Sequence, residues 1–415
     1  MKKLLIVNGA GASLDFGMPS VRDVDSLFSK WGNEWLPLTT IPNASLYSWV
    51  KDTLEGYITN NSNNRKEVLL NFENILFTIQ SLAELDKDHT WAQYRNRLSP
   101  FIDLKKFPPI RNYLGKEQDA NGDDFAVLHS RLVDNLLDHF RKQCQDLSSK
   151  KHKEVQQLRS FLTSLKDEFG LGIINLNYDN VVLSALPDLK TGFNAAGEFD
   201  RSILYDQSWN FCYHLHGSVH FDMKSTEGQP LHRIFWNKDL HAVFASNSSG
   251  RSGNFSGEGI MHLSSNIIAG LDKANQLLRE PFANYFMQLD RLIYEADAIL
   301  FIGYGFADQH LNKAFQFIRY DKTKTRKVGV LDYASDKEDG ISWRHDGWSL
   351  GIFTTVPFNG FEMAARKFAE RHPAVYFKRH NTFEKSYNPE YPLAIWYNGL
   401  LPACQFPDKF KKELL

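Results

Sequence analysis

The chain has 415 residues, enough for two or three average domains or for one large α/β domain with insertions. Its 42% hydrophobic and 13% aromatic residues can bury a substantial core, which excludes a largely disordered protein. Lysine plus arginine number 48 and aspartate plus glutamate 49, so the net charge of −1 excludes a general electrostatic grip on nucleic acid and leaves only a local basic patch open.

The features that report on location predict a cytoplasmic protein with no membrane contact. The first apolar run, Leu4–Val7, is far shorter than the apolar core of a secretory signal. No run approaches the ~18 apolar residues of a membrane span. Cys144, Cys212 and Cys404 are isolated and odd in number, so they predict neither a disulfide framework nor a CxxC zinc pair.

The first elements predict the opening unit of a nucleotide-binding α/β fold. Residues 3–8 are typical of a buried strand, a glycine-rich turn follows, and residues 21–31 are typical of a helix. The alternation of strands and helices then stops. Apolar residues at three-to-four spacing predict a helical insertion over about residues 40–165. Its helices are expected at 43–58, 67–85, 125–144 and 154–169, with polar breaks at 59–65 and 116–124.

Strand signals return in "LGIINLNYDN" (171–180) and "FCYHLHGSVHF" (211–221). A polar stretch at 247–259 is typical of a loop and could act as a lid. The remaining elements are predicted as helices at 266–278 and 281–296, a strand at 298–305, a helix at 307–320 and a strand at 327–333.

The C-terminal part from about residue 335 mixes short strands, a helix at 360–372 and an aromatic tail at 390–406. That tail is too apolar to be free in solvent, so it packs on the core or on another subunit. We therefore predict an α/β protein with a Rossmann-like parallel sheet over residues 1–332, a large helical insertion, and a small α+β extension over 333–415 for packing or oligomerisation.

The turn after the first strand contains a glycine pair. Gly9 and Gly11 are followed by Leu14 where the dinucleotide fingerprint requires a third glycine, so a Rossmann dehydrogenase motif is excluded. Two glycines before a helix still let the backbone approach a phosphate at free N–H groups. An ordinary tight turn explains the same pair equally well.

Two polar residues follow the strand that ends in "LGIIN". Asn177 lies where ligands bind in open α/β sheets, and its amide could hold a sugar hydroxyl or a water. The common alternative is a helix cap, and the same alternative applies to Asp179, for which we favour the cap.

The pair His214 and His216 in "YHLHGS" has three interpretations: buried strand residues, metal ligands, or a catalytic base. Spacing by two places both on one face of a strand, but no second cluster of ligands accompanies them, so we do not favour a metal. We interpret His214 as a core residue. His216 precedes Gly217, which is expected to leave the imidazole at a rim where a base would be useful.

The stretch "FIGYGFADQHL" is the fourth candidate. Gly303 and Gly305 at a strand end leave room for a phosphate or a ribose, and Asp308 opens the next helix. Asp308 is by default an N-cap, and His310 is better explained as a surface or helix-packing residue than as a catalyst.

In order, "GAGAS…FGMP", "NYD", "HLHGS" and "IGYGFAD" resemble the motifs of the sirtuin family, and particularly its sirtuin-like NAD-cleaving domains in bacterial antiphage defence proteins. The resemblance covers residues 1 to about 332. It implies that Asn177 and His216 are catalytic and that a further set of residues binds NAD. That set is Gly9, Ala10, Gly11, Ala12, Ser13, Gly17, Pro19, Asp179, Gly217, Gly303, Gly305 and Asp308.

Two departures from the family pattern affect the expected activity. The two CxxC pairs of the zinc ribbon in protein deacylases are absent, so no zinc is expected. The usual Phe-Arg pair is also absent, and Arg22 supplies an arginine in a shifted position. The resemblance therefore implies NAD glycohydrolase activity, with NAD as substrate, rather than deacylation.

Three functions remain open: an NAD-depleting effector, a protein deacylase, and a non-catalytic NAD-sensing scaffold. The resemblance to defence proteins also implies a homo-oligomer that assembles with a HerA-type hexameric DNA-translocating ATPase. The helical insertion and the aromatic tail are the segments expected to make subunit contacts.

Overall fold

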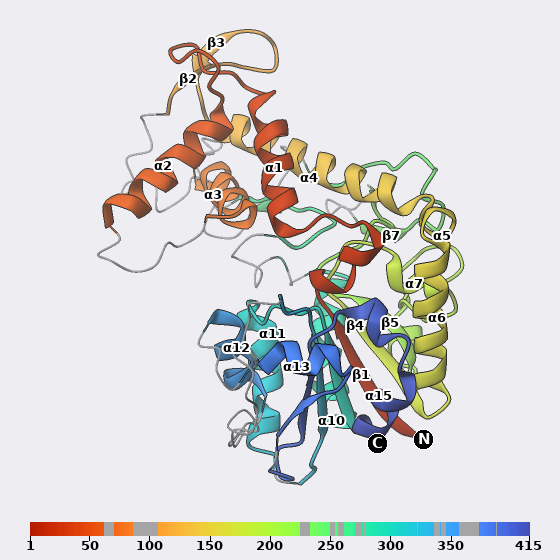
Figure 1. Ribbon diagram of the computed structural model, residues 1–415. Coiled ribbons are helices and arrows are strands. Elements are labelled where there is room, and N and C mark those ends of the chain that lie inside the picture. Colours follow the sequence, from red (N-terminus) through yellow and green to blue (C-terminus); the bar gives the residue numbers. More distant parts are fainter. Residues whose placement is uncertain are drawn as a thin grey trace. The chain divides into compact units, whose positions relative to one another are not determined.

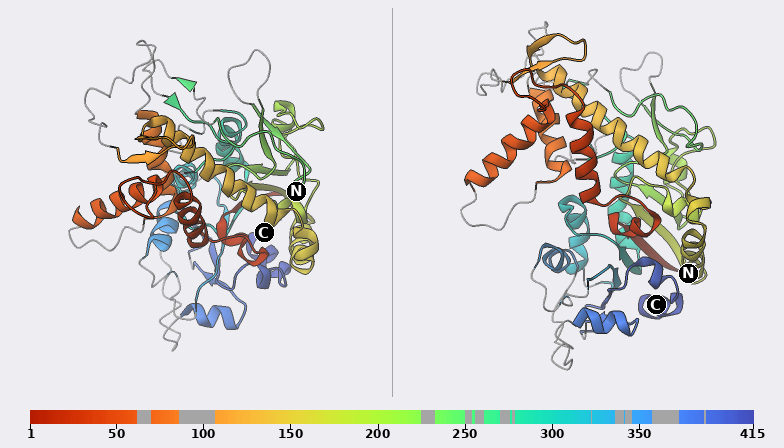
Figure 2. Two further views of the ribbon diagram at one scale, coloured as in Figure 1. Left: turned by 90° about the horizontal axis from the view of Figure 1, so that it is seen from above. Right: turned by 45° about the horizontal axis from the view of Figure 1, so that its top comes forward.

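The computed structural model describes residues 1–61, 70–85, 107–224, 233–249, 254–255, 261–269, 276, 279–321, 323–335, 341, 346–356, 373–386 and 388–415. The chain divides into two compact units (Figures 1 and 2). Unit 1 consists of residues 1–18, 143–218 and 277–415, and unit 2 consists of residues 19–142 and 219–276. Within the described residues, no helix combines the length and the apolar character needed to cross a bilayer.

A seven-stranded sheet forms the centre of unit 1, in the order β12-β13-β11-β10-β1-β4-β5. All neighbouring strands are parallel except β12 and β13. Taken in chain order, the six parallel strands lie 3-2-1-4-5-6 across the sheet, the arrangement of doubly wound α/β folds. This confirms the predicted fold class. The strands are β1 (Lys2–Asn8), β4 (Phe169–Asn175), β5 (Asn210–His214), β10 (Ala298–Ile302), β11 (Lys327–Leu331), β12 (Glu384–Lys385) and β13 (Leu393–Trp396).

The strand order reverses between β1 and β10. These two strands pair in parallel, with Asn8 opposite Ile302 at their carboxyl ends. The chain leaves β1 toward β4 and leaves β10 toward β11, and such a reversal of strand order is the position where doubly wound folds bind ligands. The fold therefore places the turns that follow Asn8 and Ile302 at the expected ligand site.

Every residue of β4 and β10 is buried. Because side chains along a strand alternate between the two faces of a sheet, both faces must be covered, and helices provide this cover. Helix α6 packs on β4, α15 on β11, and α10 on β1 and β5. The helical elements of unit 1 are η1 (Ala10–Ala12), η2 (Leu14–Phe16), α5 (Leu147–Lys150), α6 (His152–Lys166), α7 (Val181–Ala185), α8 (Arg201–Leu204), α10 (Phe282–Glu295), α11 (Gln309–Phe315), η5 (Gln316–Arg319), α12 (Gly347–Thr355), α13 (Pro373–Arg379), α14 (Leu400–Ala403) and α15 (Pro407–Leu414).

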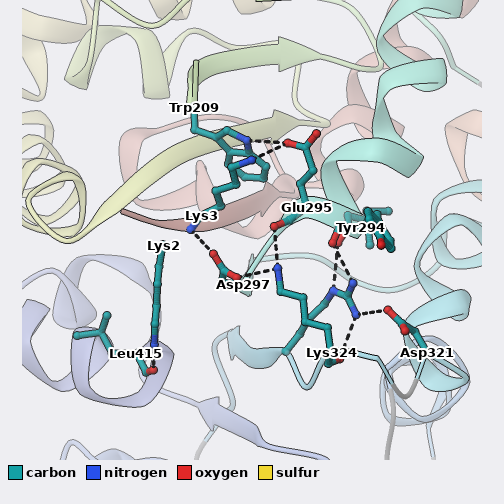
Figure 3. Close-up of polar contacts among 11 residues, drawn as sticks. Lys2, Lys3, Trp209, Tyr294, Glu295, Asp297, Asp321, Lys324 and Leu415 are labelled. Carbon is teal, nitrogen blue, oxygen red and sulfur yellow. Dashed lines mark hydrogen bonds and ion pairs between the residues drawn. The ribbon is translucent and has the colours of Figure 1, made fainter. Parts of the chain in front are cut away.

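Charged residues tie together the opposite, amino-terminal edge of the sheet (Figure 3). Glu295 at the end of α10 pairs with Lys3 at 2.9 Å and accepts a hydrogen bond from Trp209 Nε1 at 3.1 Å. Two residues after Glu295, Asp297 Oδ1 forms an ion pair with Lys324 Nζ at 2.7 Å. These partly exposed pairs each contribute about 1 kcal/mol or less, so they fix the geometry of this edge more than they stabilise it.

The aromatic tail packs on the core of its own chain. Strand β13 lies inside the sheet beside β11, and Trp396 is fully buried against Phe383, Phe406 and Phe410. Phe410 of α15 in turn contacts Phe161 of α6. Strands from the segment expected to form an extension thus complete the main sheet. The helix predicted at 360–372 lies outside the described residues.

Unit 2 contains three of the four predicted insertion helices, α2, α3 and most of α4. The fourth predicted helix is α6, which belongs to unit 1 and packs on its sheet. The elements of unit 2 are α1 (Val21–Asn33), α2 (Leu46–Asn61), α3 (Phe72–Leu85), β2 (Pro109–Arg111), β3 (Glu117–Asp119), α4 (Gly122–Cys144), β6 (Phe221–Lys224), β7 (Arg233–Trp236), β8 (Asn254–Phe255) and β9 (Met261–His262).

Two predictions for unit 2 were wrong. The polar break at 116–124 contains β3, which pairs with β2; its sequence "EQD" lacks the apolar alternation that marks a strand. The helix predicted from residue 266 does not begin there, because the buried Asn266 amide donates to Phe221 O at 2.7 Å and holds residues 266–269 in irregular chain. Most of the predicted loop at 247–259 lies outside the described residues.

Candidate active site

The turns after β1 and β10 pack backbone against backbone. Gly9 N donates to Ile302 O at 2.9 Å, and Gly11 N donates to Gly303 O at 3.0 Å. A β-carbon on Gly9 would lie 2.6 Å from Gly303 O, and one on Gly11 would lie 2.9 Å from Gly303 Cα. The close contact of these two turns therefore requires glycine at both positions. This is a second reason for the glycine pair, beside the approach of a phosphate that the sequence suggested.

The second glycine pair is not equivalent. Gly303 has φ of +57°, and a β-carbon there would lie 2.1 Å from Ala12 N. Gly305 has nothing within 4 Å of such a β-carbon, and its φ is not in the left-handed region. Of these two positions, only 303 therefore requires glycine in the described structure. Both glycines were expected to leave room for a ligand.

Asn177 follows β4 and ties the Gly9 turn to the neighbouring strand end. Its Nδ2 donates to Gly9 O and to Ser13 Oγ, both at 2.9 Å. Helix α7 has Asn180 as its N-cap, so Asn177 is not a helix cap. Because both amide hydrogens are used within the chain, Oδ1 is the atom that Asn177 can offer to a water or a ribose hydroxyl.

Asp179 is buried beneath the same turn. Its Oδ1 accepts a hydrogen bond from Val181 N at 3.0 Å, the short-range turn contact typical of aspartate before a helix. Burial raises the pKa of the Asp179 carboxyl, while the Ser13 hydroxyl and Val181 N–H act in the opposite direction. With an exposed fraction of 1%, Asp179 supports the shape of the turn.

Replacing Asp179 with asparagine is expected to change how stability depends on pH. A carboxyl whose pKa is raised on folding costs stability once it must ionise, so its unfavourable contribution grows as pH rises above the ordinary value of 3.8 and levels off above the raised pKa. Asparagine still accepts from Val181 N but does not titrate. Urea unfolding of both proteins from pH 4 upward should show Asp179→Asn gaining stability relative to the unmodified chain; a constant difference would contradict the raised pKa.

His214 is the last residue of β5 and is fully buried. Asn175 Nδ2 lies 3.3 Å from its Nδ1, and Cys212 Sγ lies 3.9 Å from its Nε2. Because the Asn175 Nδ2 group can only donate, His214 Nδ1 accepts and the ring carries its proton on Nε2. This geometry confirms the interpretation of His214 as a core residue.

His216 lies in the turn after β5, because the strand ends at His214. The prediction that both histidines share one strand face was therefore wrong. Gly217 has φ of +107° and donates its N–H to His214 O at 3.3 Å, so glycine permits the turn that carries His216 past the strand end. Among the described residues, no three histidine, cysteine, aspartate or glutamate side chains are grouped to hold a metal ion.

Asp308 lies beside His216, with 3.1 Å between Asp308 Oδ2 and His216 Nε2. The two side chains come from turns on either side of the point where the strand order reverses. The side chain of Asp308 is 8% exposed and that of His216 is 12% exposed. Asp308 Oδ1 accepts from His310 N at 3.1 Å and from Leu311 N at 3.2 Å, which confirms the predicted N-cap of α11.

The other predicted site residues are divided between the two units. Ala10, Ala12, Ser13 and Gly17 belong to the turn after β1, whereas Pro19 is the first residue of unit 2. A cavity of about 10 Å³ lies beside Ala12 and Ser13, large enough for about one water molecule. This cavity is too small for a dinucleotide.

Two buried asparagines at the strand ends escaped the sequence analysis. Asn8 and Asn175 are adjacent in the register of β1 and β4, and both are over nine-tenths buried. Asn8 Oδ1 accepts no hydrogen bond from the described residues. The available signal was a polar residue directly after an apolar strand in both "KLLIVN" and "LGIIN".

Comparison with known proteins agrees with the motifs of this edge. A family model described as SIR2-like domain matches residues 172–347, which include Asn177, His216 and Asp308. The match covers less than half of the chain. The match begins after the Gly9 turn, so the first motif lies outside it. No curated protein matches the sequence.

The solved structures that this chain resembles are similar to it only weakly. A Sir2 homologue in complex with ADP-ribose is 12% identical, with 80% of each chain covered and a TM-score of 0.30. A Sir2 homologue in complex with NAD is also 12% identical, with 80% of this chain and 77% of the other covered and a TM-score of 0.31. The fold class rests on the sheet order described above.

Proposed function

We propose that this chain is an NAD glycohydrolase, which converts NAD and water into nicotinamide, ADP-ribose and a proton. The observation that carries the proposal is the convergence of Asn177, His216 and the Gly9 turn at the carboxyl edge of one doubly wound sheet. Asn177 is bonded to that turn, and His216 follows the next strand. The family match over residues 172–347 supports the same assignment.

The bond to be broken joins ribose C1′ to a cationic nicotinamide ring, which takes the bonding electrons and leaves as a neutral molecule. The leaving group needs no general acid, so the site must orient the substrate, stabilise an oxocarbenium-like transition state and supply a water. Asn177 Oδ1 would accept a hydrogen bond from that water or from a ribose hydroxyl. His216 would accept the proton, an effect of about 10²–10⁴-fold.

The Gly9 turn would hold the pyrophosphate. Gly9 N already donates to Ile302 O and Gly11 N to Gly303 O, so these two amides serve the fold. Binding energy from the distant half of NAD would then position the scissile bond.

Product identification separates this proposal from its two alternatives. Purified chain is incubated with NAD, with and without an acetylated peptide, and products are resolved by chromatography and mass spectrometry. Nicotinamide and ADP-ribose without peptide support hydrolysis, whereas O-acetyl-ADP-ribose formed only with peptide would establish a deacylase. Calorimetric NAD binding with no product would favour the sensor.

We also propose, from the resemblance to defence proteins, that the chain depletes NAD in antiphage defence as a homo-oligomer with a HerA-type ATPase. The helices of unit 2 are then the better candidate for subunit contacts, because the aromatic tail packs on its own sheet. Mass photometry of the purified chain, alone and mixed with such an ATPase, is expected to show a defined large assembly. A monomer under both conditions would contradict this proposal.

A further inference from the structure

His216 and Asp308 face each other across the point where the strand order reverses, which their sequence motifs did not suggest. The separation of 3.1 Å between His216 Nε2 and Asp308 Oδ2 is a hydrogen-bond distance. Neither motif lies near the other in sequence, and both side chains are nearly buried, so solvent screens the pair little.

The Asp308 carboxylate is held rigidly. Oδ1 accepts two backbone hydrogen bonds from the first turn of α11, which leaves Oδ2 directed at His216. The chain before it is also fixed, because Tyr304 donates to Asn312 Oδ1 at 2.8 Å and Asn312 donates to Phe306 O at 2.8 Å. Several mutually supporting contacts therefore set the position of Oδ2 before any substrate binds.

A carboxylate oxygen can only accept a hydrogen bond, which determines the state of the histidine. His216 must present its proton on Nε2 toward Asp308, and its lone pair then resides on Nδ1. A catalytic base in a single tautomer and a single ring orientation is ready to accept a proton, and a nearby carboxylate stabilises the imidazolium that forms.

We propose that Asp308 is a positioning residue that fixes the tautomer and orientation of His216, so that Nδ1 is the atom that accepts the proton during NAD cleavage. The inference rests on the proposed function. It differs from the role that the family resemblance implied for Asp308, which was direct binding of NAD.

Asp308→Asn tests this proposal because asparagine caps helices as well as aspartate does. Its Oδ1 would keep the backbone hydrogen bonds of α11, while Nδ2 would replace Oδ2 and present a donor to His216. The proton would then move to Nδ1, and kcat for NAD hydrolysis should fall about 10²-fold with KM nearly unchanged. Asp200→Asn is the matched control, because Asp200 caps α8 through Ser202 N.

The second readout does not depend on activity. Long-range proton–nitrogen NMR on the ¹⁵N-histidine-labelled full chain, with His216 assigned by its absence in His216→Ala, reports which ring nitrogen carries the proton. The proposal requires a proton on Nε2 in the unmodified chain and on Nδ1 in Asp308→Asn. Asp308→Ser, which caps without reaching His216, serves if the asparagine variant fails to fold.

The outcomes separate the two proposals. Unchanged kcat in Asp308→Asn, or a raised KM with unchanged kcat, would overturn the positioning role while NAD hydrolysis stands. A proton that stays on Nε2 in the variant would overturn it as well. If the unmodified chain does not cleave NAD, the proposed function and the catalytic role of Asp308 both fall, even where NMR shows the pair.

Discussion

His216→Ala is expected to lower kcat for NAD hydrolysis by about 10²–10⁴-fold, the usual contribution of a general base. The ring follows the end of β5, outside the strand itself, so its removal is expected to delete the base without disturbing the sheet. Initial rates of nicotinamide release over a range of NAD concentrations measure the change. KM should vary little, because the proposed role lies in the transition state.

His152→Ala is the matched control, since His152 is an exposed first residue of α6 in the same unit. This control should retain full activity and the melting temperature of the unmodified chain. His216→Ala should share that melting temperature within a few degrees, which separates lost chemistry from lost folding. Activity that survives in His216→Ala would contradict the assignment of His216 as the base.

Gly303→Ala is expected to have the largest effect on stability, about 2–6 kcal/mol of unfolding free energy. A left-handed backbone costs a non-glycine residue about 1–3 kcal/mol. A β-carbon 2.1 Å from Ala12 N adds an overpacking cost of about the same size, because a backbone atom cannot move aside as a side chain can. Separation of the Gly9 and Gly303 turns would also disorder the proposed pyrophosphate site.

Gly305→Ala provides the comparison two residues away. Nothing lies within 4 Å of the added β-carbon, so its unfolding free energy should stay within about 0.5 kcal/mol of the unmodified value. Urea unfolding followed by tryptophan fluorescence measures both variants. Equal destabilisation by the two substitutions would contradict the described contact between the turns.

The strands and long helices followed from local sequence pattern. Buried strands such as "KLLIVN" and "AILFI" are continuous apolar runs, as parallel strands covered on both faces must be. The amphipathic helices α1 and α10 were predicted near their observed ends for the same local reason. The glycine-rich turn could also be placed at a strand end, which located the edge where ligands bind.

Contacts between distant segments could not be predicted in this way. The hydrogen bond from Asn177 to Gly9 O and the pair of His216 with Asp308 depend on strand order, which no local pattern encodes. Helix α6 has the same periodicity as its neighbours in the insertion, yet it belongs to the sheet of unit 1 because of its contact with β4. The short strand β13 became visible as part of the sheet only through its partner β11.

The most direct test of the account is the time course of NAD consumption by the purified chain, alone and with a HerA-type ATPase, beside Asn177→Ala and His216→Ala. We expect nicotinamide and ADP-ribose in equal amounts from the unmodified chain under at least one condition, and from neither variant. NAD that remains intact under both conditions, or is consumed equally well by both variants, would contradict the assignment of this sheet edge as a glycohydrolase site.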